Sequence, residues 1–177
     1  MNIPNTLTTI RFFLIPVLGY FLYQGYYIWS VIILGLSGLT DILDGFFARK
    51  LDMITSWGKF ADPLADKLTQ LTTLAVLCIK NKIHLIIIVI ILLKEILMGI
   101  GSLLLYRQDN IVVSSNWYGK MATVILYFSV ILVIFDVPHA SVLVTIAVVS
   151  SLFSLFMYMI NFFKIKASLN REKNSDI

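Results

Sequence analysis

Four aspartates lie close together within otherwise hydrophobic sequence, and they are the clearest indication of chemistry in the chain. They form two pairs, Asp41 with Asp44 and Asp62 with Asp66, within a stretch of 26 residues. An ionised side chain at membrane depth is costly unless it is paired, hydrated or bound to a metal. Four acids therefore need compensating positive charge, which a pair of divalent cations would supply.

Helical geometry brings the two members of each pair together. An α-helix turns by about 100° per residue, so Asp41 and Asp44 fall on one face. Asp62 and Asp66 are four residues apart and share a face of the next hydrophobic segment. Two antiparallel helices joined by a short connection can turn these faces toward each other. The spacing therefore predicts a carboxylate cluster at one end of a helix pair.

Small residues and one arginine accompany the acids. Gly45 and Ala48 continue the first face, and Gly58 precedes Asp62 by one turn. Small side chains allow close approach of helices and leave room for a ligand. Oxygen ligands without nearby His or Cys suit hard cations such as Mg²⁺, Mn²⁺ or Ca²⁺, and Arg49 adds a fixed charge suited to phosphate. This combination indicates a site that handles a pyrophosphate group.

The composition indicates that lipid surrounds much of the chain. Of its 177 residues 59% are hydrophobic, and the mean hydropathy is +0.89. The net charge of +4 does not indicate nucleic-acid binding, because the basic residues mostly flank hydrophobic segments. The single cysteine, Cys78, excludes an internal disulfide.

We predict an all-α fold, a six-transmembrane-helix bundle with short loops and a short N-terminal interfacial segment. Each predicted span is close to the ~20 residues that cross a bilayer. The domain is expected to occupy residues 1–163, followed by a polar cytoplasmic tail at 164–177. The predicted spans are Leu7–Tyr26, Trp29–Ala48, Phe60–Lys80, His84–Tyr106, Tyr118–Asp136 and Ser141–Phe163.

The distribution of basic residues predicts the orientation. Six spans place both termini on the side that also holds the aspartate ends of the second and third spans. Lys80 and Lys82 lie on the opposite side. The terminal side holds Arg49, Lys50, Lys59, Arg107, Lys120, Lys164, Lys166, Arg171 and Lys173. Because cytoplasmic loops are enriched in Lys and Arg, we expect an integral protein of the cytoplasmic membrane with termini and acids facing the cytoplasm.

The acids, small residues and arginine together form the pattern D-x2-D-G-x2-A-R-x8-G-x3-D-x3-D. The chain matches all eight positions, which are Asp41, Asp44, Gly45, Ala48, Arg49, Gly58, Asp62 and Asp66. In this pattern the chain resembles the CDP-alcohol phosphatidyltransferases. Its length and six predicted spans resemble that family as well, so the resemblance covers essentially the whole chain.

The resemblance implies a reaction in which an alcohol hydroxyl displaces CMP from a CDP-linked lipid. It implies two divalent cations, Mg²⁺ or Mn²⁺, as cofactors, with Asp41, Asp44 and Asp62 as metal ligands. Asp66 would be a further ligand and the general base. The expected nucleotide-binding residues are Gly45, Ala48, Arg49 and Gly58. The implied partners are CDP-diacylglycerol, an alcohol acceptor, membrane lipid and a second copy in a homodimer.

Two features resemble the branch of phosphatidylglycerophosphate synthases and cardiolipin synthases. One is the run Asp-Pro-Leu-Ala-Asp-Lys at 62–67, and the other is N-x2-T-x2-R, which contains Thr8 and Arg11. Glycerol 3-phosphate is therefore the expected acceptor and phosphatidylglycerol the alternative. An anionic acceptor requires nearby cations. The predicted acceptor-binding residues are Thr8, Arg11, Arg107 and Lys120.

Two other functional classes remain open. In a structural role, the acids would pair with Lys67, Lys94 or Arg11 to hold the bundle together, and such pairing would explain one or two of them. Adjacent on one helix, Lys94 and Glu95 are expected to point to different sides. In a divalent-cation transporter, acids should continue across the membrane, but residues 68–79 contain none.

Overall fold

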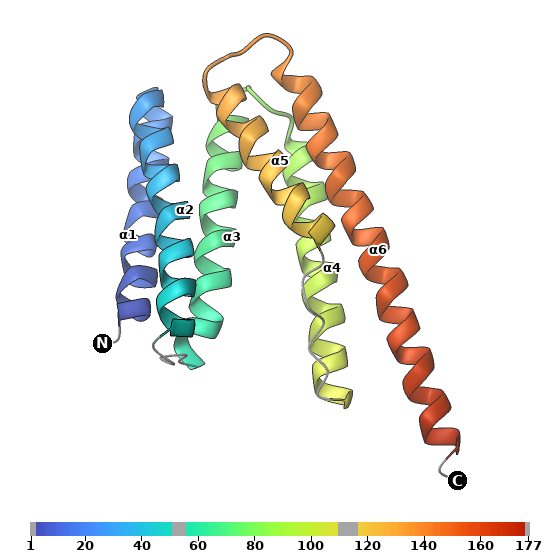
Figure 1. The fold of residues 1–177 in the computed structure, drawn as a ribbon. Helices are drawn as coiled ribbons and strands as arrows, with labels where there is room; N and C mark the ends of the chain where they lie inside the picture. Colours follow the sequence, from blue (N-terminus) through green and yellow to red (C-terminus); the bar gives the residue numbers. More distant parts are fainter. Residues whose placement is uncertain (1–2, 51–55, 110–116, 176–177) are drawn as a thin grey trace. The chain divides into compact units, whose positions relative to one another are not determined.

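The computed structural model describes residues 3–50, 56–109 and 117–175, with side chains described for 5–44, 46, 58, 61–104 and 117–167. The described residues form six α-helices and no strand. The helices are α1 (Ile3–Gln24), α2 (Tyr27–Lys50), α3 (Ser56–Ile79), α4 (Leu85–Asp109), α5 (Trp117–Ile134) and α6 (Ala140–Ser175) (Figure 1). The predicted all-α fold is therefore confirmed.

The helices differ from the predicted spans mainly at their ends. The residues expected to form an interfacial segment, from Ile3 onward, belong to the first turns of α1, and α6 continues through the predicted tail to Ser175. Within the described part of the chain, α1, α2, α4, α5 and α6 each contain a stretch long and apolar enough to cross a membrane. The first half of α3 carries the charged residues Asp62, Asp66 and Lys67. That α3 also crosses the membrane therefore stays a prediction.

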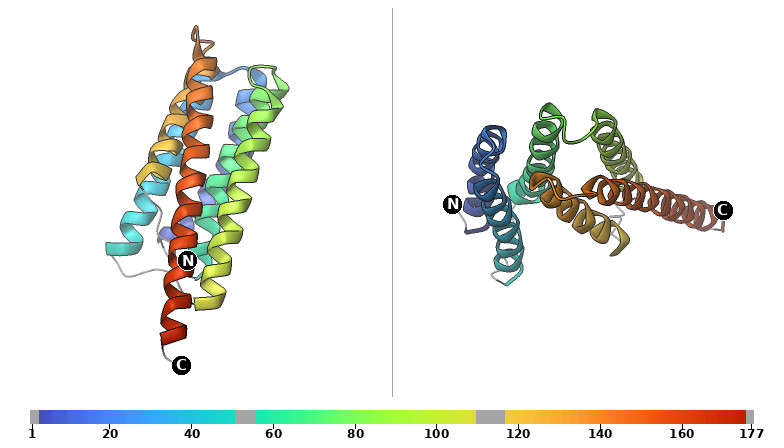
Figure 2. Two further views of the ribbon diagram at one scale, coloured as in Figure 1. Left: turned by 90° about the vertical axis from the view of Figure 1, so that its right-hand side faces the viewer. Right: turned by 90° about the horizontal axis from the view of Figure 1, so that it is seen from above.

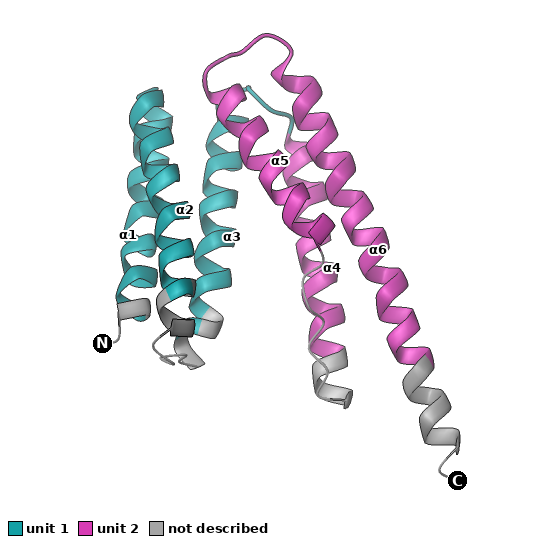
Figure 3. Ribbon diagram, in the orientation of Figure 1, with its two compact units in different colours: residues 1–84 teal, residues 85–177 magenta. Residues whose placement is uncertain are grey.

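The chain divides into two compact units, residues 1–84 and 85–177 (Figure 3). In the first unit, α1 packs along both α2 and α3, as Figures 1 and 2 show. Leu18, Leu22 and Leu77 are among the fully buried side chains of this unit. Gly19 of α1 closely approaches α3, since a Cβ atom there would lie 3.1 Å from Thr72 Cγ2. The short connections of this unit make its successive helices antiparallel.

Three helices end in the same kind of turn, and each uses a residue that tolerates left-handed backbone. After α1, Gly25 has φ 83°, and the N–H of Tyr26 donates to the carbonyl of Phe21 at 2.9 Å. The corresponding residues after α3 and α5 are Asn81, with φ 57°, and Asp136, with φ 53°. Such a cap satisfies carbonyls at the helix end. These turns separate α1 from α2, α3 from α4 and α5 from α6.

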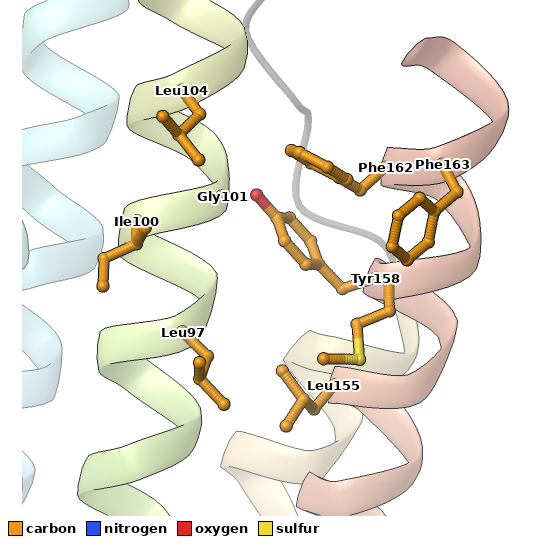
Figure 4. A pocket seen from close by; sticks show the side chains of 9 residues that line it. Leu97, Ile100, Gly101, Leu104, Leu155, Tyr158, Phe162 and Phe163 are labelled. Atoms are coloured by element: carbon orange, nitrogen blue, oxygen red, sulfur yellow. The ribbon is translucent and has the colours of Figure 1, made fainter. Parts of the chain in front are cut away.

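In the second unit, α6 packs against both α4 and α5. A cavity of about 170 Å³ lies between α4 and α6, lined by apolar side chains (Figure 4). The ring of Tyr158 from α6 points toward Gly101 of α4. A Cβ atom at position 101 would lie 3.0 Å from Tyr158 Cε1 and 3.1 Å from its hydroxyl oxygen. The absence of a side chain at Gly101 therefore allows Tyr158 to pack against α4.

This contact predicts a position-specific effect of adding one methyl group to α4. Gly101→Ala should destabilise the protein by about 1–3 kcal/mol, because the new methyl group displaces the Tyr158 ring. Gly99→Ala is the matched control, since a Cβ atom at Gly99 meets nothing within 4 Å. The measurement is the melting temperature of the purified protein in one detergent. Equal melting temperatures for the two variants would contradict the predicted contact.

Candidate active site

Arg11 of α1 lies at the centre of the four aspartates and is fully buried. Its Nη1 donates to Asp41 Oδ1 at 2.8 Å and to Asp66 Oδ1 at 2.6 Å. Its Nη2 donates to Asp44 Oδ2 and lies 3.7 Å from Asp62 Oδ1. One guanidinium group therefore contacts carboxylates from both α2 and α3. We call these five side chains the Arg11 cluster.

Local helix geometry explains how three helices build the cluster. Arg11 lies one turn beyond Thr8 on α1, and both side chains are buried. The Thr8 hydroxyl donates to Asp62 Oδ1, which ties α1 to α3 independently of the arginine. Because α1 packs against both α2 and α3, a long side chain from α1 can reach the acids of both helices. The predicted convergence of the two aspartate pairs is thus observed.

The carboxylates differ in their exposure. Asp44 is nearly buried, with only 3% of its side chain exposed. The exposed fraction of the side chain is much larger for the other three acids: 44% for Asp41, 33% for Asp62 and 45% for Asp66. Three acids therefore border an open side that a ligand can approach. With every group ionised, one positive charge faces four negative charges, which leaves the Arg11 cluster with a formal charge of −3.

The donor chemistry of the cluster suits a hard divalent cation, because all its acidic ligands are carboxylate oxygens. Its present arrangement is organised by Arg11 instead. Among the residues that the structure describes, no group of three or more His, Cys, Asp or Glu side chains is positioned to hold a metal ion. The excess negative charge and the open side satisfy two requirements of a cation site, while the guanidinium group occupies its centre.

Arg11 pairs with more of the acids than the sequence analysis expected of a basic residue in a structural role. Pairing with a basic residue was expected to explain one or two acids, yet Arg11 contacts all four. That expectation was wrong because a guanidinium group presents five N–H donors in a planar fork, and two of its nitrogens can each serve two carboxylates. The signal available in the sequence was Thr8 and Arg11, one helical turn apart in a hydrophobic segment.

The other predicted site residues are only partly described. Gly45, Ala48 and Arg49 lie on α2 beyond Asp44, but their side chains are outside the described residues; Gly58 is buried on α3.

Two predicted acceptor-binding residues belong to the second unit. Lys120 is exposed on α5, and Arg107 lies on α4 with its side chain outside the described part. Also in this unit, Lys94 Nζ lies 2.7 Å from Glu95 Oε1. The two residues are adjacent and so begin on different sides of α4, but the long lysine side chain reaches its neighbour's carboxylate.

Comparison with known proteins gives a consistent result. The family model of the CDP-alcohol phosphatidyltransferases matches residues 1–159. A CDP-diacylglycerol–glycerol-3-phosphate 3-phosphatidyltransferase of Aquifex aeolicus is 31% identical over 168 residues, which cover 92% of this chain and 94% of that protein. A protein of Bacillus subtilis with the same name is 29% identical over 137 residues, covering 69% of this chain and 70% of the relative.

A probable cardiolipin synthase (CMP-forming) of Drosophila melanogaster is also similar. It is 34% identical over 108 residues, which cover 60% of this chain and 34% of that longer protein. Both kinds of synthase that the sequence resembles therefore occur among the relatives. The family match over residues 1–159, the complete eight-residue pattern and the convergence of its four aspartates agree: the chain belongs to the CDP-alcohol phosphatidyltransferase family.

Proposed function

We propose that the protein transfers a phosphatidyl group from CDP-diacylglycerol to glycerol 3-phosphate, with release of CMP. The observation that carries the proposal is the convergence of Asp41, Asp44, Asp62 and Asp66 on one point of a membrane protein of this family. The Aquifex aeolicus relative, aligned over nearly the whole length of both chains, is named for this reaction.

The four aspartates are the proposed ligands of two divalent cations, Mg²⁺ or Mn²⁺. Bound there, the cations would neutralise the charge of the pyrophosphate and of departing CMP. The nearly buried Asp44 and the more exposed Asp41, Asp62 and Asp66 would together hold the ions. An oxygen-only set of ligands is compatible with either metal.

Asp66 is the proposed general base. Its side chain is nearly half exposed, so an acceptor hydroxyl can come within hydrogen-bonding reach. The hydroxyl oxygen forms a bond to the phosphorus attached to diacylglycerol, while the bond from that phosphorus to the CMP oxygen breaks. The hydroxyl proton passes to the Asp66 carboxylate. The balanced products are the phosphatidylated acceptor and CMP.

The remaining motif residues surround the reacting groups in this proposal. Gly45, Ala48, Arg49 and Gly58 would contact the cytidine diphosphate portion, with Arg49 supplying charge for its phosphates. The proposed acceptor-binding residues are Thr8, Arg11, Arg107 and Lys120; the positive charges of the last three suit an anionic acceptor.

The cellular setting follows from substrate chemistry and charge. In the described part of the chain, five helices are long and apolar enough to cross a membrane, which agrees with a lipid substrate. We place the protein in the cytoplasmic membrane as a homodimer, with termini and active site toward the cytoplasm. The concentration of Lys and Arg on that side supports this orientation.

Cardiolipin synthesis is the second candidate, with phosphatidylglycerol as the acceptor. It is favoured by the similarity to the Drosophila melanogaster relative and to a cardiolipin synthase (CMP-forming) of Streptomyces coelicolor, 34% identical over 101 residues.

The proposed base predicts a selective loss of turnover. Asp66→Asn should lower CMP release by at least about 100-fold, because the amide cannot accept the hydroxyl proton and is a poorer metal ligand. Asp136→Asn, at an exposed turn after α5, is the matched control and should retain wild-type turnover. CMP is measured from purified protein given CDP-diacylglycerol, Mg²⁺ and glycerol 3-phosphate. Wild-type turnover by Asp66→Asn would refute the assignment.

Metal removal and acceptor choice can be tested in the same assay. A chelator should abolish CMP release, and either Mg²⁺ or Mn²⁺ should restore it, because the carboxylates alone repel the pyrophosphate. Undiminished turnover in chelator would contradict metal dependence.

Mass spectrometry of the lipid product should show phosphatidylglycerophosphate from glycerol 3-phosphate. If a lipid product forms only when phosphatidylglycerol is the acceptor, and that product is cardiolipin, the result would support the second candidate.

A further inference from the structure

Arg11 occupies the position that bound cations require, and this overlap has a functional consequence. We propose that Arg11 and divalent cations are alternative counter-ions of the same four carboxylates, so that cation loading releases the guanidinium group from the cluster. The inference rests on the proposed function, because it takes the Arg11 cluster to be the cation site. It assigns Arg11 a positioning role that changes with the state of the site.

The hydrogen bonds show why the two counter-ions compete. Arg11 contacts one oxygen of each carboxylate: Oδ1 of Asp41, Asp62 and Asp66, and Oδ2 of Asp44. A divalent cation binds such oxygens at about 2.0–2.6 Å. A cation held by several of these oxygens would lie within a few ångströms of the guanidinium group. Their like charges would repel, and the burial of Arg11 and Asp44 limits screening by water. Each counter-ion therefore weakens the binding of the other.

Burial explains why the cluster needs a counter-ion before cations arrive. The Arg11 side chain is fully buried, and a guanidinium group remains charged at every physiological pH. Without Arg11, Asp44 would retain a buried charge close to three other acids. The arginine thus holds the carboxylates of α2 and α3 together in the ion-free protein.

Two features make release of the guanidinium group feasible. Among the residues that the structure describes, its buried Nε has no hydrogen-bond partner, and the contacts to the acids come from its two terminal nitrogens. Asp41 and Asp66 are nearly half exposed, which lets cations enter from the open side. The bond from the Thr8 hydroxyl to Asp62 can keep α1 joined to α3 during the exchange.

The test is the affinity for Mn²⁺, measured by electron paramagnetic resonance of the free ion with full-length protein in nanodiscs. Arg11→Met should bind Mn²⁺ at least about tenfold more tightly than wild type, because one competing charge is removed. Its melting temperature should be lower without ions and rise more on adding Mn²⁺. Lys80→Met is the matched control. This lysine follows the end of α3 and lies over the Tyr23 ring, whereas Asp62 and Asp66 lie in the first half of α3. Its replacement should therefore leave the Mn²⁺ affinity unchanged.

Arg11→Lys keeps the charge and provides a second variant should Arg11→Met fail to fold. A compact ammonium group cannot span four carboxylates as the fork does, so Mn²⁺ should bind more tightly than to wild type and less tightly than to Arg11→Met. If both variants bind Mn²⁺ no more tightly than the wild-type protein does, and the wild-type protein releases CMP, this inference alone is overturned. Absence of both Mn²⁺ binding and CMP release in the wild type would overturn the proposed function as well.

Discussion

The contact of one buried guanidinium group with four carboxylates is the constraint on which the first half of the structure depends. Charges cannot be left unpaired in a hydrophobic bundle, so α1 must place Arg11 where the acids of α2 and α3 converge. The packing of α1 against both helices, and the close approach at Gly19, meet this requirement. The proposed cation site is thereby held together by a positively charged side chain of the protein itself.

The uneven exposure of the acids connects this constraint to function. Asp44 is buried against Arg11, whereas Asp41 and Asp66 each use one oxygen for the arginine and remain open to a ligand. In the proposed function, the excess of negative charge on the open side attracts divalent cations, which in turn bind the pyrophosphate. If cations bind as proposed, the same side chains stabilise the ion-free protein and take part in the reaction. The two states then differ in which positive charge the carboxylates contact.

Much of this arrangement could be predicted from the sequence, because helical periodicity and hydrophobicity are local properties. The spacings of Asp41 with Asp44 and of Asp62 with Asp66 placed each pair on one face, and in the structure the two faces meet. The meeting of Arg11 with all four acids depends on how three helices pack, which no local pattern specifies. The pairing of Lys94 with Glu95 likewise depends on side-chain conformation rather than on helical position.

The most direct measurement is a structure of the protein with Mn²⁺ and CDP-diacylglycerol, in which anomalous scattering locates the metal. We expect Mn²⁺ among the carboxylates of Asp41, Asp44, Asp62 and Asp66, with the pyrophosphate bound to it and the Arg11 guanidinium group moved out of the cluster. Arg11 still contacting the four acids, with the nucleotide bound and no Mn²⁺ among them, would contradict it.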